Sequence, residues 1–144
     1  HLLITLKALL MTEGPQVQAA KAVLEAHLTA LNAHDEKALA DTLHFPHHRL
    51  SEGVLKIWET PNEYFDDFRE RAGKNWGYTR WGELAPVQEG VDKVHFAVRV
   101  DRFRPDGSLL SCFPSLWVVA NLNGKWAAQL RSSFANDRKN SHQP

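Results

Sequence analysis

Two apolar runs flank the dipeptide Asn123-Gly124 in the stretch LLSCFPSLWVVANLNGKWAAQLRSSF, which covers residues 109–134. Asn and Gly both tolerate the positive φ of a type I′ turn, so this dipeptide predicts a two-residue hairpin. After the turn, apolar residues such as Trp126 and Leu130 alternate with mostly polar ones, and a period of two is typical of a strand with one buried face. The stretch therefore predicts two long antiparallel strands.

Two further turn signals lie upstream, at Pro105-Asp106-Gly107 and at Glu89-Gly90. At the first of these turns proline fixes φ and glycine is free to take a positive φ. The sequence thus predicts a four-stranded antiparallel meander whose strands are long enough to twist and curl. In its second strand we expect one apolar set to face the helices, formed by Val94, Phe96, Val98 and Val100.

The third strand of this meander, residues 109–121, carries apolar residues on both of its faces, so both faces need cover. Helices can cover one face, and the other face needs a second subunit or more chain. Pro114 cannot donate to a ladder, so we expect a bulge or a sheet edge there. The single cysteine, Cys112, excludes an internal disulfide, and we expect it to be a small buried residue.

Three helices are expected before the meander. The first begins at Pro15, and the second is capped by Asp35 and extends to Leu43. The third begins with a capping box at Thr60 and ends at Gly73. The first helix carries an apolar stripe at helical spacing, formed by Val17, Ala20, Leu24, His27, Leu28 and Leu31.

The chain of 144 residues is long enough for one domain, and its 17 basic and 17 acidic residues are interspersed. No basic block is present, so we expect no nucleic-acid or membrane partner. Residues 1–10 are apolar but too short for a membrane span, and they fit a signal peptide poorly. We therefore expect a leader or disordered extension at 1–14, one domain at 15–135, a flexible tail at 136–144, and a cytoplasmic location.

The predicted order is helix, helix, short hairpin, helix and four long strands. With the elbow Leu43-His44-Phe45-Pro46-His47 and the run Ser115-Leu116-Trp117-Val118-Val119 before the Asn123-Gly124 turn, residues 17–134 resemble the nuclear transport factor 2-like (NTF2-like) superfamily, in its SnoaL-like and ketosteroid-isomerase-like branch. The resemblance implies an α+β fold: a curved antiparallel sheet forms a cone or half-barrel, and three N-terminal helices pack on its concave side. It also implies a pocket at the open end and a homodimer packed through the sheet face.

Ketosteroid isomerases of this family use a carboxylate base on the strand after the second helix, together with a tyrosine and a protonated aspartic acid that hold the oxyanion. The corresponding strand here, residues 47–51, offers His47, His48 and Arg49 instead. The strand of residues 109–121 contains no Asp or Glu. We therefore do not expect steroid isomerase chemistry.

Histidines near this elbow are the best remaining candidates. A neutral His47 can act as the catalytic acid or base, and Arg49 can hold a carboxylate or enolate oxygen. In the rival interpretation, His44 caps a helix end, His48 packs in the core and His47 is solvated.

Further substrate contacts are predicted at Trp58 and Tyr64, which flank the start of the third helix, and at His44 and His95. His95 has a rival interpretation as part of the dimer face. A metal site formed by His44, His47 and His95 fits no zinc spacing, so we expect no metal, and no motif indicates a cofactor.

Two functions remain open at this point. The first is a pocket that binds, and could transform by isomerase-, dehydratase- or hydrolase-type acid–base chemistry, a small apolar or aromatic molecule with one polar or acidic group. The second is a non-catalytic dimerising module whose cone is filled by its own aromatic side chains. An open cavity that reaches His47 would favour the first. A protein–protein adaptor would need an exposed apolar patch outside the dimer face.

Overall fold

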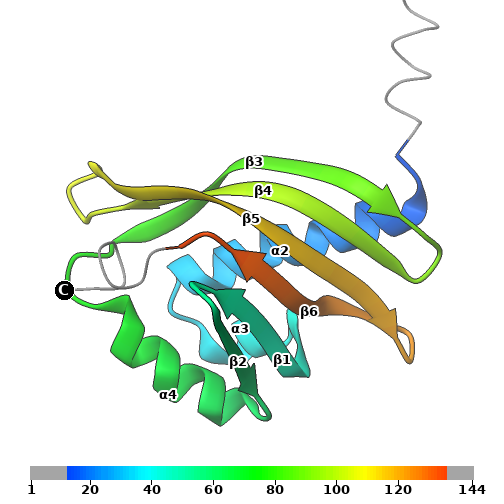
Figure 1. The fold of residues 1–144 in the computed structure, drawn as a ribbon, viewed down its shortest axis with the longest axis horizontal. Helices are drawn as coiled ribbons and strands as arrows, with labels where there is room; N and C mark the ends of the chain where they lie inside the picture. Colours follow the sequence, from blue (N-terminus) through cyan, green and yellow to red (C-terminus); the bar gives the residue numbers. More distant parts are fainter. Residues whose placement is uncertain (1–12, 136–144) are drawn as a thin grey trace, which may run out of the picture.

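The computed structural model describes residues 13–135, so the leader and tail expected at the two ends lie mainly outside the described residues. A six-stranded sheet has the order β2-β1-β6-β5-β4-β3 (Figure 1). Its elements in chain order are α2 (Pro15–Asn32), α3 (Glu36–Ala40), β1 (Leu43–Ser51), β2 (Val54–Trp58), α4 (Pro61–Ala72), β3 (Tyr78–Glu89), β4 (Lys93–Phe103), β5 (Leu109–Leu122) and β6 (Lys125–Ser133).

The predicted antiparallel meander is β3 to β6, and the turns at Asn123-Gly124 and Pro105-Asp106-Gly107 contain the expected positive φ angles. Asn123 and Gly124 have φ of 54° and 84°, as a type I′ turn requires, and Gly107 has φ of 90°. The sheet as a whole is mixed rather than antiparallel, because β1 pairs with β6 in parallel. The predicted α+β cone is otherwise confirmed: the sheet curves without closing, and the helices lie on its concave side (Figure 1).

Pro114 lies just beyond the last β5–β6 pair, Ser115 with Ser133. The N–H group that proline lacks therefore removes no hydrogen bond between these paired residues. The bulge lies further along, where Val118 pairs with Leu130 but Val119 pairs with Ala128. One extra residue on β6, Gln129, is therefore left between these pairs. Such a bulge bends the strand and reverses which face the following side chains occupy.

Helix α2 is fixed to the edge strand β3 by polar contacts. The Asn32 amide accepts from the Thr79 N–H and donates to the Thr79 carbonyl, both at 2.8 Å. The predicted second helix ends at Ala40 instead of Leu43. The backbone beyond it joins the sheet, since the Thr42 carbonyl accepts from Ala128 N at 2.8 Å. The expected cap is present, with the Asp35 carboxylate accepting from Ala38 N at 3.1 Å.

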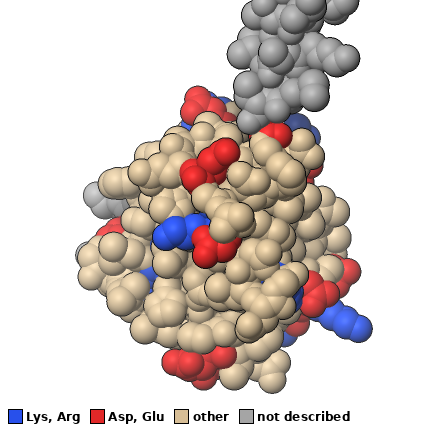
Figure 2. Space-filling model, turned by 90° about the vertical axis from the view of Figure 1, so that its right-hand side faces the viewer, with Lys and Arg blue, Asp and Glu red and all other residues tan. Residues whose placement is uncertain are grey.

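The core lies between α2 and the inner face of the sheet. The apolar set expected on β4 is buried there, as predicted. Among the described helices, none has the length and apolar character needed to cross a bilayer. On the face in Figure 2, charged side chains are scattered among uncharged ones, without a large basic patch.

The outer, convex face of the sheet exposes apolar side chains. Leu50 pairs with Leu55 there, and Val118 pairs with Leu130. Leu55 is 59% exposed and Leu50 is 46% exposed. Cys112 is exposed, contrary to the prediction, because its parity on β5 places it opposite Asp101 and away from the helices.

Candidate functional site

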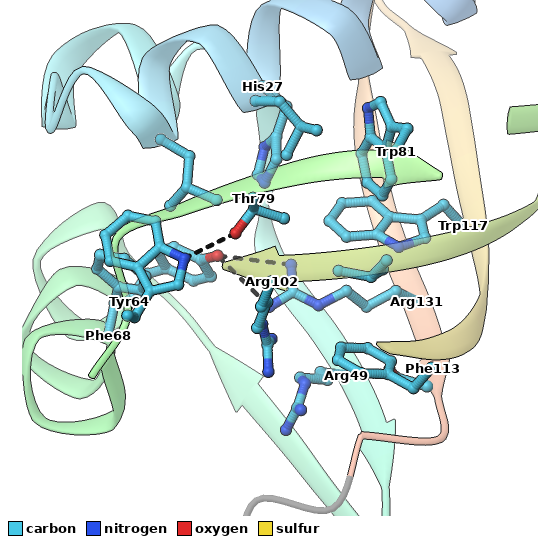
Figure 3. A pocket seen from close by; sticks show the side chains of 15 residues that line it. His27, Arg49, Tyr64, Phe68, Thr79, Trp81, Arg102, Phe113, Trp117 and Arg131 are labelled. Carbon is cyan, nitrogen blue, oxygen red and sulfur yellow. Dashed lines mark hydrogen bonds between the residues drawn. The ribbon is translucent and has the colours of Figure 1, made fainter. Parts of the chain in front are cut away.

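A pocket opens between the helices and the inner face of the sheet (Figure 3), with walls from α2, α4, β1, β3, β4, β5 and β6. Its volume, counted as space open to the centre of a water-sized sphere, is about 60 Å³. By that measure one water needs roughly 10–15 Å³, so the pocket holds a few waters or part of a small ligand. The half-buried members of its lining are Leu31, Phe68, Trp76, Trp81 and Arg102.

Three arginines line this pocket: Arg49 on β1, Arg102 on β4 and Arg131 on β6. Arg49 and Arg131 are cross-strand partners on the inner face, and they are only 4% and 8% exposed. Over the described residues that line the pocket, no Asp or Glu accompanies them. The lining therefore carries a positive charge in a setting of low dielectric constant, where electrostatic interactions are strong.

Aromatic rings surround the Arg131 guanidinium. Its Cζ atom lies 4.7 Å from the ring centroid of Trp117, 5.8 Å from that of Tyr64 and 5.9 Å from that of Trp58. Both terminal nitrogens also donate to the Tyr64 hydroxyl at 3.4 Å (Figure 3). These contacts hold the guanidinium plane in place and turn its Nη1 and Nη2 atoms toward Tyr64.

Tryptophans form much of the pocket wall. Trp76 and Trp81 use their indole N–H groups in hydrogen bonds, whereas the buried Nε1 of Trp117 has no hydrogen-bond partner among the described residues. Trp76 donates its indole N–H to the Thr79 hydroxyl at 2.8 Å, and Trp81 donates to the Leu24 carbonyl at 2.9 Å. The indoles therefore offer the pocket mainly apolar surface, with their orientation fixed by these hydrogen bonds.

Helix α4 brings Tyr64 and Phe68 to the pocket. Its N-terminus is capped as predicted, with the Thr60 hydroxyl accepting from Glu63 N at 3.2 Å. The Asp67 carboxylate on α4 accepts from Lys56 Nζ at 3.1 Å and from Trp58 Nε1 at 3.2 Å. These bonds attach α4 to β2 and so set one wall of the pocket.

His27 of α2 points into the pocket and is 3% exposed (Figure 3). Burial, and secondarily the charge of Arg131, lowers its pKa from 6.5 to about 3. The imidazole is therefore neutral at physiological pH. A base this weak serves better as a fixed hydrogen-bonding group than as a proton acceptor in catalysis.

The structure places His47 behind the pocket wall and not among the lining side chains. It is 0% exposed, and its ring lies 6.1 Å from each of Trp58 and Tyr64. The Ala128 carbonyl can only accept, so His47 Nδ1 donates to it at 3.0 Å. Burial, then the charge of Arg131, lowers the pKa of His47 well below 6.5.

The other predicted site residues are dispersed. His44 donates from Nε2 to the Ala120 carbonyl at 2.9 Å. His95 lies on the face of β4 opposite the buried apolar set, and its Nδ1 is 2.8 Å from Oε1 of Gln88 on β3. Trp58 is buried beside Tyr64, with ring centroids 5.0 Å apart. Within residues 13–135, no group of three or more His, Cys, Asp or Glu side chains is placed to hold a metal ion.

Of the predicted set, the structure therefore brings Arg49 and Tyr64 to the pocket. Sequence reasoning missed His27, Arg102 and Arg131. His27 was counted in the apolar stripe of the first helix, and a histidine in such a stripe was the available signal. Arg131 was placed on the polar face of its strand, because the bulge at Gln129 has no sequence signal of its own.

A search of protein-family models finds no match to this sequence. A search of curated proteins finds no significant match either. Solved structures do match, at low sequence identity. One is an NTF2-like protein with a cystatin-like fold from Novosphingobium aromaticivorans, with 13% identity, a TM-score of 0.67, and coverage of 93% of this chain and 88% of that one.

A protein of unknown function with a cystatin-like fold from Nostoc punctiforme has 11% identity and a TM-score of 0.66 over 81% of this chain and 88% of its own. A ketosteroid isomerase-like protein from Erwinia carotovora atroseptica has 15% identity and a TM-score of 0.59 over 84% of this chain and 96% of its own. At these identities the likeness concerns the fold. The chain therefore has the α+β fold of the nuclear transport factor 2-like superfamily, as the sequence resemblance implied.

Proposed function

We propose that this protein binds a small aromatic or apolar molecule that carries one acidic group. The observation that carries the proposal is the pairing of Arg49 and Arg131, both buried, at the inner end of a pocket with aromatic walls. Both side chains line the pocket, so an anion that enters it comes close to two guanidinium groups. Carboxylates match the planar fork of arginine bidentately.

The size of the pocket limits the ligand. At about 60 Å³ by the measure given above, the enclosed space takes at most one ring with its acid group. Aromatic walls and a small number of fixed polar groups are the usual composition of a small-molecule site. A ligand with a single ring therefore fits this pocket better than one with several fused rings.

The proposal is for binding. The acid–base role predicted for His47 remains an untested prediction, and it gains no support from a ring that does not line the pocket. The Erwinia carotovora relative is described as ketosteroid isomerase-like, but a shared fold does not transfer a reaction.

The test is a calorimetric titration of the full chain with benzoate and with benzamide, which has the same shape without the charge. Benzoate is expected to bind, and benzamide is expected to bind at least tenfold more weakly, since charge-assisted hydrogen bonds contribute about 1.5–3 kcal/mol. Equal binding of the two compounds would remove the anion-holding role. Absence of binding by both would remove the proposal.

The small volume also favours a second candidate, the dimerising module whose cone is filled by its own side chains. Rings such as Phe96, Trp117 and Trp58 occupy much of the concave side and are at most 5% exposed. The same titration separates the two candidates, because a self-filled cone predicts no response to any aryl carboxylate.

We also propose that two copies of the chain pair through the outer face of the sheet. Apolar side chains on β1, β2, β5 and β6 are exposed there, among them Leu50 and its cross-strand partner Leu55, Leu116 and Leu130. Soluble monomers rarely leave a large patch of this kind uncovered. A second copy presents the same patch, so a two-fold axis through it buries both.

A further inference from the structure

We infer that the ligand also carries a hydroxyl or N–H group, which it donates to Nε2 of His27, so that the ligand is a hydroxy- or amino-substituted aromatic acid. This inference rests on the proposed function, because it concerns the opposite end of the same ligand. Three features of the described residues carry it: the tautomer of His27, the accessibility of its Nε2, and its position relative to Arg131.

The tautomer of His27 follows from its neighbours. The Thr42 hydroxyl donates its single proton to the Leu39 carbonyl at 2.7 Å. The same oxygen lies 2.8 Å from His27 Nδ1, so it must accept a proton from that nitrogen. His27 is therefore protonated on Nδ1, and Nε2 carries a lone pair.

Nε2 of His27 faces the pocket. Within residues 13–135 it makes no hydrogen bond, and it is not among the fully enclosed polar atoms that lack a partner. His27 itself is one of the lining residues, and its ring points from α2 into the pocket (Figure 3). The structure thus offers one fixed acceptor at the upper end of a pocket whose lower end carries arginines.

The charge state of this acceptor is stable. Burial and Arg131 lower the pKa of His27 to about 3, so the ring stays neutral throughout the range in which an aryl carboxylate is ionised. The nearest cationic groups facing it across the pocket are those of Arg49, Arg102 and Arg131. These charges disfavour an imidazolium and leave Nε2 as an acceptor.

His27 and Arg131 lie against the same wall of the pocket. Both contact the Trp117 indole, with a His27–Trp117 centroid distance of 5.1 Å and an Arg131 Cζ–centroid distance of 4.7 Å. A hydroxybenzoate carries a hydroxyl and a carboxylate at two positions of one flat ring, which suits two partners along one aromatic wall.

The experiment is a calorimetric comparison of benzoate, 3-hydroxybenzoate, 4-hydroxybenzoate and 4-methoxybenzoate on the full chain. At least one hydroxy isomer is expected to bind roughly tenfold more tightly than benzoate, because it satisfies a buried acceptor that benzoate leaves unpaired. The methoxy compound has no proton to donate and is expected to gain nothing. His27→Phe is expected to abolish the ratio between hydroxybenzoate and benzoate, whereas the outer-face control His95→Phe keeps it.

The inference is overturned if both hydroxy isomers bind no better than benzoate, or if the ratio survives in folded His27→Phe. In those cases benzoate still binds, and the proposed function stands. If no aryl carboxylate binds, the proposed function fails and this inference fails with it. Should His27→Phe not fold, the hydroxy isomers and benzoate on the unaltered chain still test the inference, because equal affinities there would overturn it.

Discussion

On strands β1 and β6, the two faces of the sheet differ in an unusual way, with buried arginines on the inner face and exposed leucines on the outer face. On the inner face, Arg49 and Arg131 are 4% and 8% exposed. Their immediate chain neighbours on the outer face, Leu50 and Leu130, are 46% and 37% exposed. Consecutive residues on a strand point to opposite faces. The dipeptides Arg49-Leu50 and Leu130-Arg131 therefore each place an arginine inside and a leucine outside.

The proposals above assign a different partner to each face. An anion that enters the pocket meets the guanidinium groups of Arg49 and Arg131. A second copy of the chain covers the exposed leucines. The comparison therefore separates two proposed binding events, one on each side of the same strands.

The largest effect is expected on the outer face. Leu130→Glu puts a charge in the middle of the proposed dimer contact, twice per dimer, and burying an unpaired charge costs on the order of 3 kcal/mol or more. Sedimentation analysis is expected to show a dimer for the unaltered chain and a monomer for the variant. Val91→Glu, in a turn and 87% exposed, is the matched control and keeps the dimer. A monomeric unaltered chain would contradict the dimer.

Next comes the inner face. Arg131→Met is expected to weaken benzoate binding by roughly 10- to 100-fold, because it removes a charge-assisted hydrogen-bonding group and keeps much of the aliphatic bulk. The control is Arg99→Met on the outer face, where Arg99 pairs with Asp101 at 2.9 Å. If Arg131→Met and Arg99→Met lost similar benzoate affinity, benzoate would not be binding specifically at the inner face.

A smaller effect concerns pH. The pKa values of His27 and His47 are below 6.5 in the folded chain, so the unfolded chain takes up protons first as the pH falls. The two histidines cost the folded chain no stability at pH values well above 6.5, where they are neutral in both the folded and the unfolded chain. Below that pH, each histidine removes about 1.4 kcal/mol per pH unit, a loss that for His27 continues down to about pH 3.

Urea unfolding between pH 6.5 and pH 5 measures this slope before most carboxylates titrate. His27→Gln is expected to remove about half of the slope that the two histidines contribute. An unchanged slope in the variant would mean that His27 is not held neutral by the fold.

The smallest effect is expected at the cap of α4, which belongs to neither face. Thr60→Ala removes the acceptor for Glu63 N and is expected to cost about 1 kcal/mol of unfolding free energy. Ligand affinity should fall by less than in Arg131→Met, because Tyr64 and Phe68 keep their places once α4 is formed. Thermal unfolding and benzoate titration of the same sample measure both quantities.

The parts of the fold that local chemistry determines were predictable from the sequence. The Asn123-Gly124 turn and the alternation in β4 depend on neighbouring residues, and both are present as expected. The parallel pairing of β1 with β6 joins distant segments and has no local signal. The predicted end of the second helix is wrong for the same reason. The Thr42 carbonyl accepts a hydrogen bond from Ala128 N of β6, a residue far away along the chain.

The candidate site was predictable in part. Arg49 and Tyr64 lie next to recognisable elements, a short strand and a capped helix. Arg131 follows the bulge at Gln129, which reverses the faces of β6, so simple alternation placed it on the wrong side. His27 has the spacing of a core residue, and only its partner Thr42, fifteen positions away along the chain, reveals a polar role.

The most direct test of the account is a crystal structure of the full chain with 4-hydroxybenzoate. The account predicts a ligand beneath α2, with its carboxylate within hydrogen-bonding distance of Arg49 or Arg131 and its hydroxyl directed at His27. A ligand on the outer face, or one whose carboxylate points out of the mouth into solvent, would contradict it.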